Sequence, residues 1–403
     1  MKNSIQQKWI MFMTGVFVFF FSCSSDETHT LYKIETGGKY GYIDSLGIEI
    51  IKPQFLLASD FNEGLAVIVV DTLITKGIGF FSTDSISYKY GYINTNNKIV
   101  LDTTFTYTEA YTEEIKKAIE NSEITLKNLL FSYDRALFQD KKTKKKGYIN
   151  KKGEIVINPI YIDGNQFSEG LAAVDFRESP IDDRKWGYID IEGKIIVSGK
   201  YFGANDFRED RAIVLLADFG DENAKWEERL INFYWLVINK FGNVEAGPFN
   251  AIFNTLFGYN NGYCIVQNEN PLWGDYIGYK FIDKNGNYTT DFDIEDVTRY
   301  GYGYAGAKTD DGWVFIDTMS NIVSNIVYEE VKPFSNGYAA VKNNGKWGYI
   351  DTTFTQVIPY KFDDCGNFKK SLAPFTLRSQ SLVIRGYINK KGKVVWQQEK
   401  FEY

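Results

Sequence analysis

The side chains of this chain that could do chemistry are mainly carboxylates. The densest acidic stretch holds Asp291, Asp293, Glu295 and Asp296. Alternating acids of this kind could bind Ca²⁺, or could supply the general acid and base of a glycosidase. The stretch lacks the central Gly and terminal Glu of an EF-hand loop. A solvated edge or loop therefore accounts for it better than a metal or catalytic site.

Most other catalytic devices are missing from the sequence. The single histidine, His29, lies shortly after Cys23 and before the first expected strand. Ser-His-Asp triads, Cys-His pairs and zinc sites all need more histidines or cysteines than the remaining chain offers. The glycines at 37–41 and 301–306 fit turns and strands rather than a phosphate-binding loop. We therefore expect no catalytic residue, no metal site and no cofactor.

Aromatic side chains are the second candidate surface. They make up 17% of the 403 residues, with 28 Tyr and 31 Phe, which favours β-strands over helices. Trp226, Trp235 and Trp273 lie near long excursions of the chain, where they could line a sugar-binding groove. Most other aromatic residues are expected in the core.

The first 22 residues are expected to be a signal peptide. Lys2 and Lys8 precede an apolar run, Trp9–Phe21, that is short for a membrane span. Ser22-Cys23 follows directly and resembles the lipobox of bacterial lipoproteins, which implies cleavage before Cys23 and lipidation of its thiol. An uncut N-terminal anchor is the alternative.

The residues after Cys23 suggest an address in the cell envelope. Ser24 resembles an outer-membrane sorting signal, and the acidic pair Asp26-Glu27 resembles the tether of some surface-exported Gram-negative lipoproteins. The periplasmic and surface-exposed orientations both stay open. The formal net charge of −7 becomes −9 once Lys2 and Lys8 are removed, which disfavours nucleic acid as a partner.

Two smaller groups of residues complete the inventory. The lysines of 141–146 are expected to be a solvated loop rather than an anion-binding patch. Cys264 and Cys365 are too few for a disulfide scaffold, so two free, buried thiols are expected.

An internal repeat must position whatever site exists. Nine segments share an Ile followed by Asp or Asn. Six of them open with Gly-Tyr-Ile, at Gly41, Gly91, Gly147, Gly187, Gly348 and Gly386, and three are degenerate, at 236–239, 280–283 and 314–317. The Asp or Asn is expected to end a strand and to bond the backbone of the following turn, a structural role.

The best-kept copies have a glycine between two aromatic residues. The structural positions that we single out in them are Trp186, Ile189 and Asp190 with their counterparts Trp347, Ile350 and Asp351. Because side chains alternate along a strand, Gly348 and Ile350 face away from Trp347, and Gly348 leaves a hole beside Ile350 on that face. We expect a Phe from a neighbouring repeat to fill it.

These residues resemble the WG-repeat family, also called KWG repeats. The resemblance rests on Lys185–Asp190, Lys346–Asp351, and the Phe-x-Glu-Gly-Leu-Ala segments at 61–66 and 167–172. It covers essentially all of the chain after residue 30. The resemblance implies an all-β repeat protein that acts as an interaction module, and it implies no reaction.

The expected architecture is all-β. Tandem three-stranded antiparallel meanders, eight to nine copies over 31–403, would form propeller-like blades or an open array, preceded by a leader (1–22) and a tether (23–30). Pro53, Pro159 and Pro359 are expected to end third strands. Apolar spacing predicts one inserted helix near 109–130.

The expected function is binding. A lipid-anchored, non-catalytic module for a protein or glycan partner is the leading hypothesis, with the membrane contacted through the lipid. The alternative is a carboxylate-dependent glycosidase on a propeller-like frame. An enzyme of that kind would gather acids from different repeats in one pocket.

Overall fold

The described part of the chain is built entirely from small antiparallel sheets. The computed structural model describes residues 30–75, 85–110, 126, 129–218, 232–250, 257–269, 276–289 and 294–401. These residues form nine open sheets of three or four strands, and the strands of each sheet follow one another in chain order. The predicted all-β class is confirmed. Within the same ranges no helix is long and apolar enough to cross a membrane.

The first four sheets take the N-terminal half of the chain. Sheet 1 contains β1 (Tyr32–Thr36), β2 (Lys39–Ile43) and β3 (Glu49–Phe55), and sheet 2 contains β4 (Leu57–Ala58), β5 (Leu65–Thr75), β6 (Ser85–Asn94) and β7 (Ile99–Ala110). Sheet 3 contains β8 (Ala136–Gln139), β9 (Lys146–Ile149) and β10 (Ile155–Tyr161), and sheet 4 contains β11 (Leu171–Asp175), β12 (Trp186–Asp190) and β13 (Ile195–Tyr201).

Five further sheets follow. Sheet 5 contains β14 (Gly203–Ala204), β15 (Arg211–Asp218), β16 (Asn232–Asn239) and β17 (Val244–Asn250), and sheet 6 contains β18 (Phe257–Asn260), β19 (Tyr263–Glu269) and β20 (Tyr276–Ile282). Sheet 7 contains β21 (Asp296–Val297), β22 (Ala305–Thr309) and β23 (Gly312–Ile316). Sheet 8 contains β24 (Glu330–Val331), β25 (Tyr338–Asn343), β26 (Lys346–Asp351) and β27 (Gln356–Phe362), and sheet 9 contains β28 (Asp364–Cys365), β29 (Leu372–Arg378), β30 (Leu382–Asn389) and β31 (Val394–Phe401).

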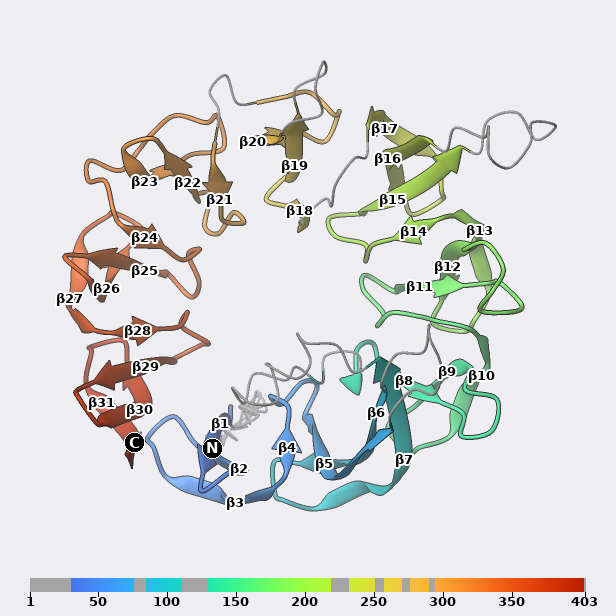
Figure 1. Ribbon diagram of the computed structural model, residues 1–403, viewed down its shortest axis with the longest axis horizontal. Helices are drawn as coiled ribbons and strands as arrows, with labels where there is room; N and C mark the ends of the chain where they lie inside the picture. The colour runs from blue at the N-terminus through green and yellow to red at the C-terminus, as the bar shows by residue number, and fades with distance from the viewer. Residues whose placement is uncertain are drawn as a thin grey trace, which may run out of the picture.

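The sheets are arranged around a central opening, and the last sheet returns to the first (Figure 1). Buried apolar clusters join each sheet to the next one along the chain. A further cluster joins sheet 9 to sheet 1 through Leu372, Tyr32, Ile34 and Ile43. No described strand of one end is inserted into the sheet of the other. The two ends of the array therefore meet face to face, without exchange of a described strand.

The residue after each repeat Ile caps a turn, as predicted. Oδ1 of Asp351 accepts hydrogen bonds from the backbone N–H of Thr353 at 2.9 Å and of Thr355 at 3.1 Å. The same pair of bonds recurs at Asp44, Asn94, Asn150, Asp190, Asn239, Asp283, Asp317 and Asn389. An Asp or Asn oxygen serves equally, which explains why both residues occupy this position.

The glycine of the motif has a different neighbour from the one expected. A side chain on Gly348 would begin 2.6 Å from the carbonyl oxygen of Ile358, and one on Gly147 would begin 2.5 Å from that of Ile157. The space is taken by the backbone of the next strand in the same sheet, which bulges there, and not by a Phe of another repeat. The expectation about the Phe is therefore wrong.

The prolines belong to the same bulges. Pro53, Pro159 and Pro359 lie inside β3, β10 and β27. The expectation that they end these strands is wrong. The register shifts at these places leave residues without ladder partners, so the missing N–H of proline does no harm.

The Phe-Ser-Glu-Gly segment is a turn and not part of a strand. Ser168 and Leu171 exchange backbone hydrogen bonds, and the two residues between them, Glu169 and Gly170, have φ of 52° and 84°. Two consecutive positive φ values are what a type I′ hairpin turn requires. The strand after this turn, β11, begins at Leu171.

The helix predicted near 109–130 is not seen. Glu109 and Ala110 are the last residues of β7, and residues 129–130 are not in an α-helix. The segments 111–125 and 127–128 lie outside the described residues. The first two residues of the predicted helix, Glu109 and Ala110, belong to the long strand β7 instead, because they pair in register with β6.

Candidate binding site

Consecutive sheets are joined by a connecting segment that fills the space between them. Between sheets 8 and 9 this segment is residues 362–368. Its Phe368 packs edge-on against Tyr349, with 4.9 Å between ring centroids. The Tyr349 hydroxyl donates a 2.7 Å hydrogen bond to the carbonyl of Gly366.

Four other interfaces repeat this arrangement. In each of them the motif Tyr donates to a backbone carbonyl two residues before a Phe, and its ring packs on that Phe. The donor and acceptor pairs are Tyr42 with Ser59, Tyr92 with Leu129, Tyr148 with Asn165, and Tyr188 with Asn205, at 2.6 to 2.7 Å. The ring partners are Phe61, Phe131, Phe167 and Phe207, at 4.7 to 4.9 Å.

The contact between sheets 9 and 1, which we call the seam, has no connecting segment because the two sheets are not consecutive in the chain. The Tyr387 hydroxyl donates directly to the carbonyl of Lys33 in β1, at 2.8 Å. Tyr32 takes the place of the Phe, with 5.7 Å between its ring and that of Tyr387. The Tyr32 hydroxyl also bonds the hydroxyl and the backbone N–H of Ser371.

A cavity of about 460 Å³ lies at the seam. We call it the seam pocket. Its lining comes from both ends of the chain, and comprises Lys33, Ile34, Glu35 and Tyr40 of sheet 1 together with Asp364, Pro374, Phe375, Thr376, Arg378, Arg385, Gly386, Tyr387, Trp396 and Gln398 of sheet 9. Its volume is within the range of about 300–1,000 Å³ that is usual for ligand sites.

One cross-strand pair that lines the pocket is polar, whereas the same position in most other sheets holds two aromatic residues. In sheet 9, Arg385 lies opposite Gln398. The equivalent pairs in sheets 1, 2, 4, 5 and 8 are Tyr40 with Phe55, Tyr90 with Phe105, Trp186 with Tyr201, Trp235 with Phe249, and Trp347 with Phe362. In sheet 3 the pair is mixed, with Lys146 opposite Tyr161. A polar pair therefore remains exposed to the pocket instead of packing against a neighbour.

The charged groups of the pocket have a positive excess. Lys33, Arg378 and Arg385 oppose Glu35 and Asp364. Burial lowers the pKa of Lys33, an effect that nearby Asp60 opposes. Its ammonium donates to the Ala58 carbonyl at 3.2 Å and lies 5.2 Å from the centre of the Tyr40 ring. No carboxylate of the described residues lies within ion-pair distance of Arg385.

Two acids from different sheets do meet in this pocket, which was the mark expected of an enzyme. Each has another partner. A carboxylate oxygen of Glu35 accepts from the N–H of Gly38 at 3.0 Å. Asp364 accepts from Lys332 at 3.2 Å and from the N–H of Cys365 at 2.8 Å, and its side chain is 58% exposed. Neither acid has the buried, apolar surroundings that a general acid needs.

Carboxylates of the repeat turns are also engaged. Glu63 accepts from the N–H groups of Tyr133 and Asp134 in the next sheet, at 2.7 and 3.1 Å. Glu169 does the same for Glu209 and Asp210. These acids are structural, because each holds the turn of the following repeat.

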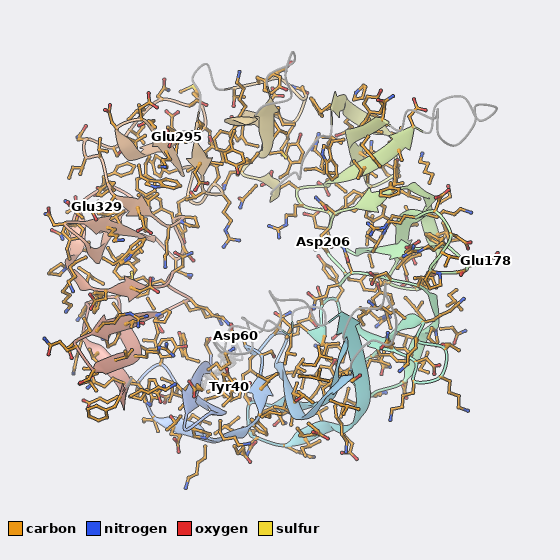
Figure 2. The ribbon with its side chains drawn as sticks, viewed as in Figure 1. Tyr40, Asp60, Glu178, Asp206, Glu295 and Glu329 are labelled. Atoms are coloured by element: carbon orange, nitrogen blue, oxygen red, sulfur yellow. The ribbon has the colours of Figure 1, made fainter. Side chains whose placement is uncertain are left out.

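Acids that face the central opening are likewise paired. Figure 2 shows Asp60 and Asp206 on that side of the ring and Glu178 on the outer side. Asp60 pairs with Lys369 at 3.1 Å, and Asp206 accepts from the Asn165 amide at 3.0 Å. In the described ranges, no group of three or more His, Cys, Asp or Glu side chains could hold a metal ion.

The repeat positions singled out in the sequence lie in the strands and turns of sheets 4 and 8. Trp347 is buried under the Lys332 ammonium, 4.8 Å from its ring centre, and Trp186 is half-buried. Ile189 and Ile350 are buried in the core. The six motif glycines lie in the central strands, and only Gly386 among the positions singled out lines the seam pocket.

The other candidates do not form a site in the described residues. Trp235 is half-buried in β16, whereas Trp226, Trp273 and His29 lie outside the described residues, as do Asp291, Asp293 and Cys23. Glu295 pairs with Lys308 at 2.9 Å. Of the lysine cluster, Lys146 is buried and pairs with Asp163. Cys264 and Cys365 are buried thiols that are not joined in a disulfide, as predicted.

The sequence carries a signal for the pocket that lies outside the repeat motif. Arg385 stands where the best-kept copies have Trp, and Gln398 stands where they have an aromatic residue. Both departures fall in the last sheet.

Several solved structures are similar to this chain, all weakly. A quinonprotein alcohol dehydrogenase-like protein from Bacteroides thetaiotaomicron is 12% identical, with 84% of this chain and 89% of that chain covered and a TM-score of 0.32. TolB from Acinetobacter baumannii is 9% identical, with 82% and 79% covered and a TM-score of 0.25. The tricorn protease is 10% identical with a TM-score of 0.24, and the match covers 91% of this chain but only 44% of the protease. Likenesses of this strength say nothing about activity.

The repeat itself identifies the family. No curated protein is significantly similar to the chain. The model of the WG-containing repeat matches residues 40–71, 90–115, 147–176, 186–218, 281–313, 315–347 and 347–378, which together are more than half of the chain. The chain belongs to the family of WG-containing repeat proteins.

Proposed function

We propose that this protein is a non-catalytic binding module, held at the cell envelope by a lipid on Cys23, that recognises a protein or glycan partner. The observation that carries the proposal is the seam pocket, which offers aromatic walls and a positive excess of charge while its two acids are engaged elsewhere. A concave site with apolar walls and a few convergent polar groups is typical of ligand binding.

The envelope address rests on the sequence. The apolar leader and Ser22-Cys23 support lipidation. The eight residues from Cys23 to Thr30 would reach at most about 28 Å when extended, so the ring would stay close to the membrane. The first strand after this tether is β1, which forms one wall of the seam pocket.

Binding is tested by capture from envelope extracts and by a glycan array, each with the purified protein. The proposal expects a specific partner in one of the two experiments and no turnover of any glycan that is bound. Absence of a specific partner from both would overturn it.

Anchoring is tested separately. Radiolabelled fatty acid should be incorporated into the wild-type protein and not into Cys23→Ser, and only the wild type should sediment with membranes. A Cys23→Ser protein that still sediments with membranes would favour the uncut anchor.

One observation favours a second function, that of a glycosidase, because Glu35 and Asp364 line the same pocket. If they were acid and base, Glu35→Gln or Asp364→Asn would abolish glycan hydrolysis by the purified protein. The binding proposal expects no hydrolysis by the wild-type protein, so that the substitutions change nothing.

A further inference from the structure

The seam pocket corresponds to the position of a missing connecting segment. Between sheets 8 and 9, Phe362 and Cys365 are buried against Trp347 and Phe375. At the seam the counterparts of Trp347 and Phe362 are Arg385 and Gln398, and both line an empty space. What fits between two sheets elsewhere in this protein therefore indicates what fits at the seam.

The backbone of β1 is open at this place. In sheet 9 the two-residue strand β28 pairs with β29, and the N–H of Asp363 donates to the carbonyl of Thr376 at 3.0 Å. Thr376 lies opposite Arg385, and its equivalent in sheet 1 is Glu35, opposite Tyr40. Among the described residues no strand pairs with the other edge of β1. An extended peptide can add to such an edge by backbone hydrogen bonds.

The internal connecting segments also show which side chains suit the space. Three of them begin with an aromatic residue followed within two residues by an acid, namely Tyr161-Ile-Asp163, Tyr328-Glu-Glu330 and Phe362-Asp-Asp364. In sheet 3 the acid of this segment, Asp163, pairs with Lys146, which directly precedes the motif glycine Gly147. Arg385 directly precedes the motif glycine Gly386, so it is the counterpart of Lys146.

We propose that the seam pocket binds a short extended segment of a partner protein that carries an aromatic side chain followed within two residues by Asp or Glu. The segment adds to the edge of β1 that no described strand pairs with, its ring lies against Tyr387 and Trp396, and its acid pairs with Arg385. This rests on the proposed binding function and specifies a peptide rather than a glycan. The positive excess of the pocket in a chain of net charge −7 supports an acidic guest.

The chain supplies its own probe. A labelled peptide with the sequence of residues 157–167 contains Tyr161 and Asp163 in the spacing of an internal connecting segment. Its binding to the purified full-length protein is followed by fluorescence anisotropy. We expect saturable binding that weakens about tenfold when the peptide carries Asp163→Asn, because a charge-assisted hydrogen bond is lost.

Variants of the protein locate the site. Arg385→Gln should weaken binding about tenfold and Arg385→Glu more strongly, while Arg184→Glu, a matched change at an exposed arginine of another sheet, should leave it unchanged. A peptide with Asp163→Lys should bind Arg385→Glu within about threefold of the original pair, because the charges are exchanged. This rescue also shows that Arg385→Glu is folded.

Other outcomes would overturn the inference. Equal binding of the peptide by wild type and Arg385→Gln, no saturable binding, or a dimer of this chain that Arg385→Glu dissociates would each contradict it. An envelope partner or glycan that wild type and Arg385→Glu capture equally well would also contradict it, while leaving the proposed binding function intact. If wild type captures no partner in any format, both proposals fail.

Discussion

The interface between sheets 8 and 9 and the seam between sheets 9 and 1 both join neighbouring sheets, but different groups fill the space between the sheets. In the first, the chain passes from one sheet to the next and buries Phe362, Cys365 and Phe368 on the way. At the seam the last described sheet meets the first without a connecting segment between them, and there Tyr387 bonds β1 directly and a pocket is left. The difference teaches that chain connectivity, as well as sheet packing, fills the internal interfaces.

The largest expected effect separates the two interfaces by truncation. Phe368→Ala should lower the free energy of unfolding by about 3–5 kcal/mol, because Phe368 is 1% exposed and its cavity would stay dry. Its seam counterpart, Tyr32→Ala, should cost less, about 2–3 kcal/mol, because the adjacent pocket admits water. Urea denaturation measures both. Equal losses would show that the seam is as tightly filled as the interior.

The pH dependence of stability should have opposite signs for Cys365, between sheets 8 and 9, and for Lys33, at the seam. Burial raises the pKa of the Cys365 thiol to about 11 from its ordinary 9.0, so between these values the folded protein holds a proton that the unfolded chain releases. Stability then falls with rising pH, by up to about 1.4 kcal/mol per pH unit from this group. The pKa of Lys33 is lowered, so its contribution rises with pH up to the unfolded value.

Denaturation between pH 8 and 10.5 checks both signs. Cys365→Ala should make the free energy of unfolding fall less steeply with rising pH, and Lys33→Met should make it fall more steeply. Variants whose pH profiles overlay the wild type would contradict the burial of these groups. Cys264→Ala provides a comparison thiol whose pKa is also raised by burial, to about 12.

A smaller effect is expected from the tyrosine hydroxyls. Tyr349→Phe leaves the half-buried carbonyl of Gly366 without this donor and should cost about 1–2 kcal/mol. Tyr387→Phe should cost about half as much, because water in the pocket can reach the carbonyl of Lys33. A larger loss at Tyr387 would mean that the seam depends on this single bond.

The smallest effect should be equal at both places. Asp351→Ala and Asn389→Ala each remove an acceptor of two backbone N–H groups and should each cost about 1 kcal/mol. Asp351→Asn should be nearly neutral. A difference of more than about 1 kcal/mol between the two alanine variants would show that sheets 8 and 9 differ in stability in their turns as well as at the seam.

Much of the repeat could be predicted because its signals are local. The Asp or Asn after Ile bonds residues two and four positions ahead, so the sequence alone contains the whole interaction. The type I′ turn at Glu169-Gly170 has a local signal too, since Gly suits the second positive φ of such a turn.

Other features depend on partners that the pattern does not name. Gly348 faces a bulge in β27, and a bulge shifts the register in a way that strict alternation cannot foresee. The seam joins Tyr387 to Lys33, residues at opposite ends of the chain. The pocket exists only because the ends meet, so no single repeat contains the information for it.

The most direct test of the account is the distance between the two ends of the array. A side chain at Gly47 in sheet 1 would touch the backbone of Val395 in sheet 9, and the exposed neighbours Leu46 and Val394 can carry spin labels as cysteines. Pulsed electron paramagnetic resonance should give one narrow distance below about 25 Å, since packed sheets are about 10 Å apart. Nine sheets in an extended stack would separate the labels by about 80 Å, and a distance of that order would contradict the account.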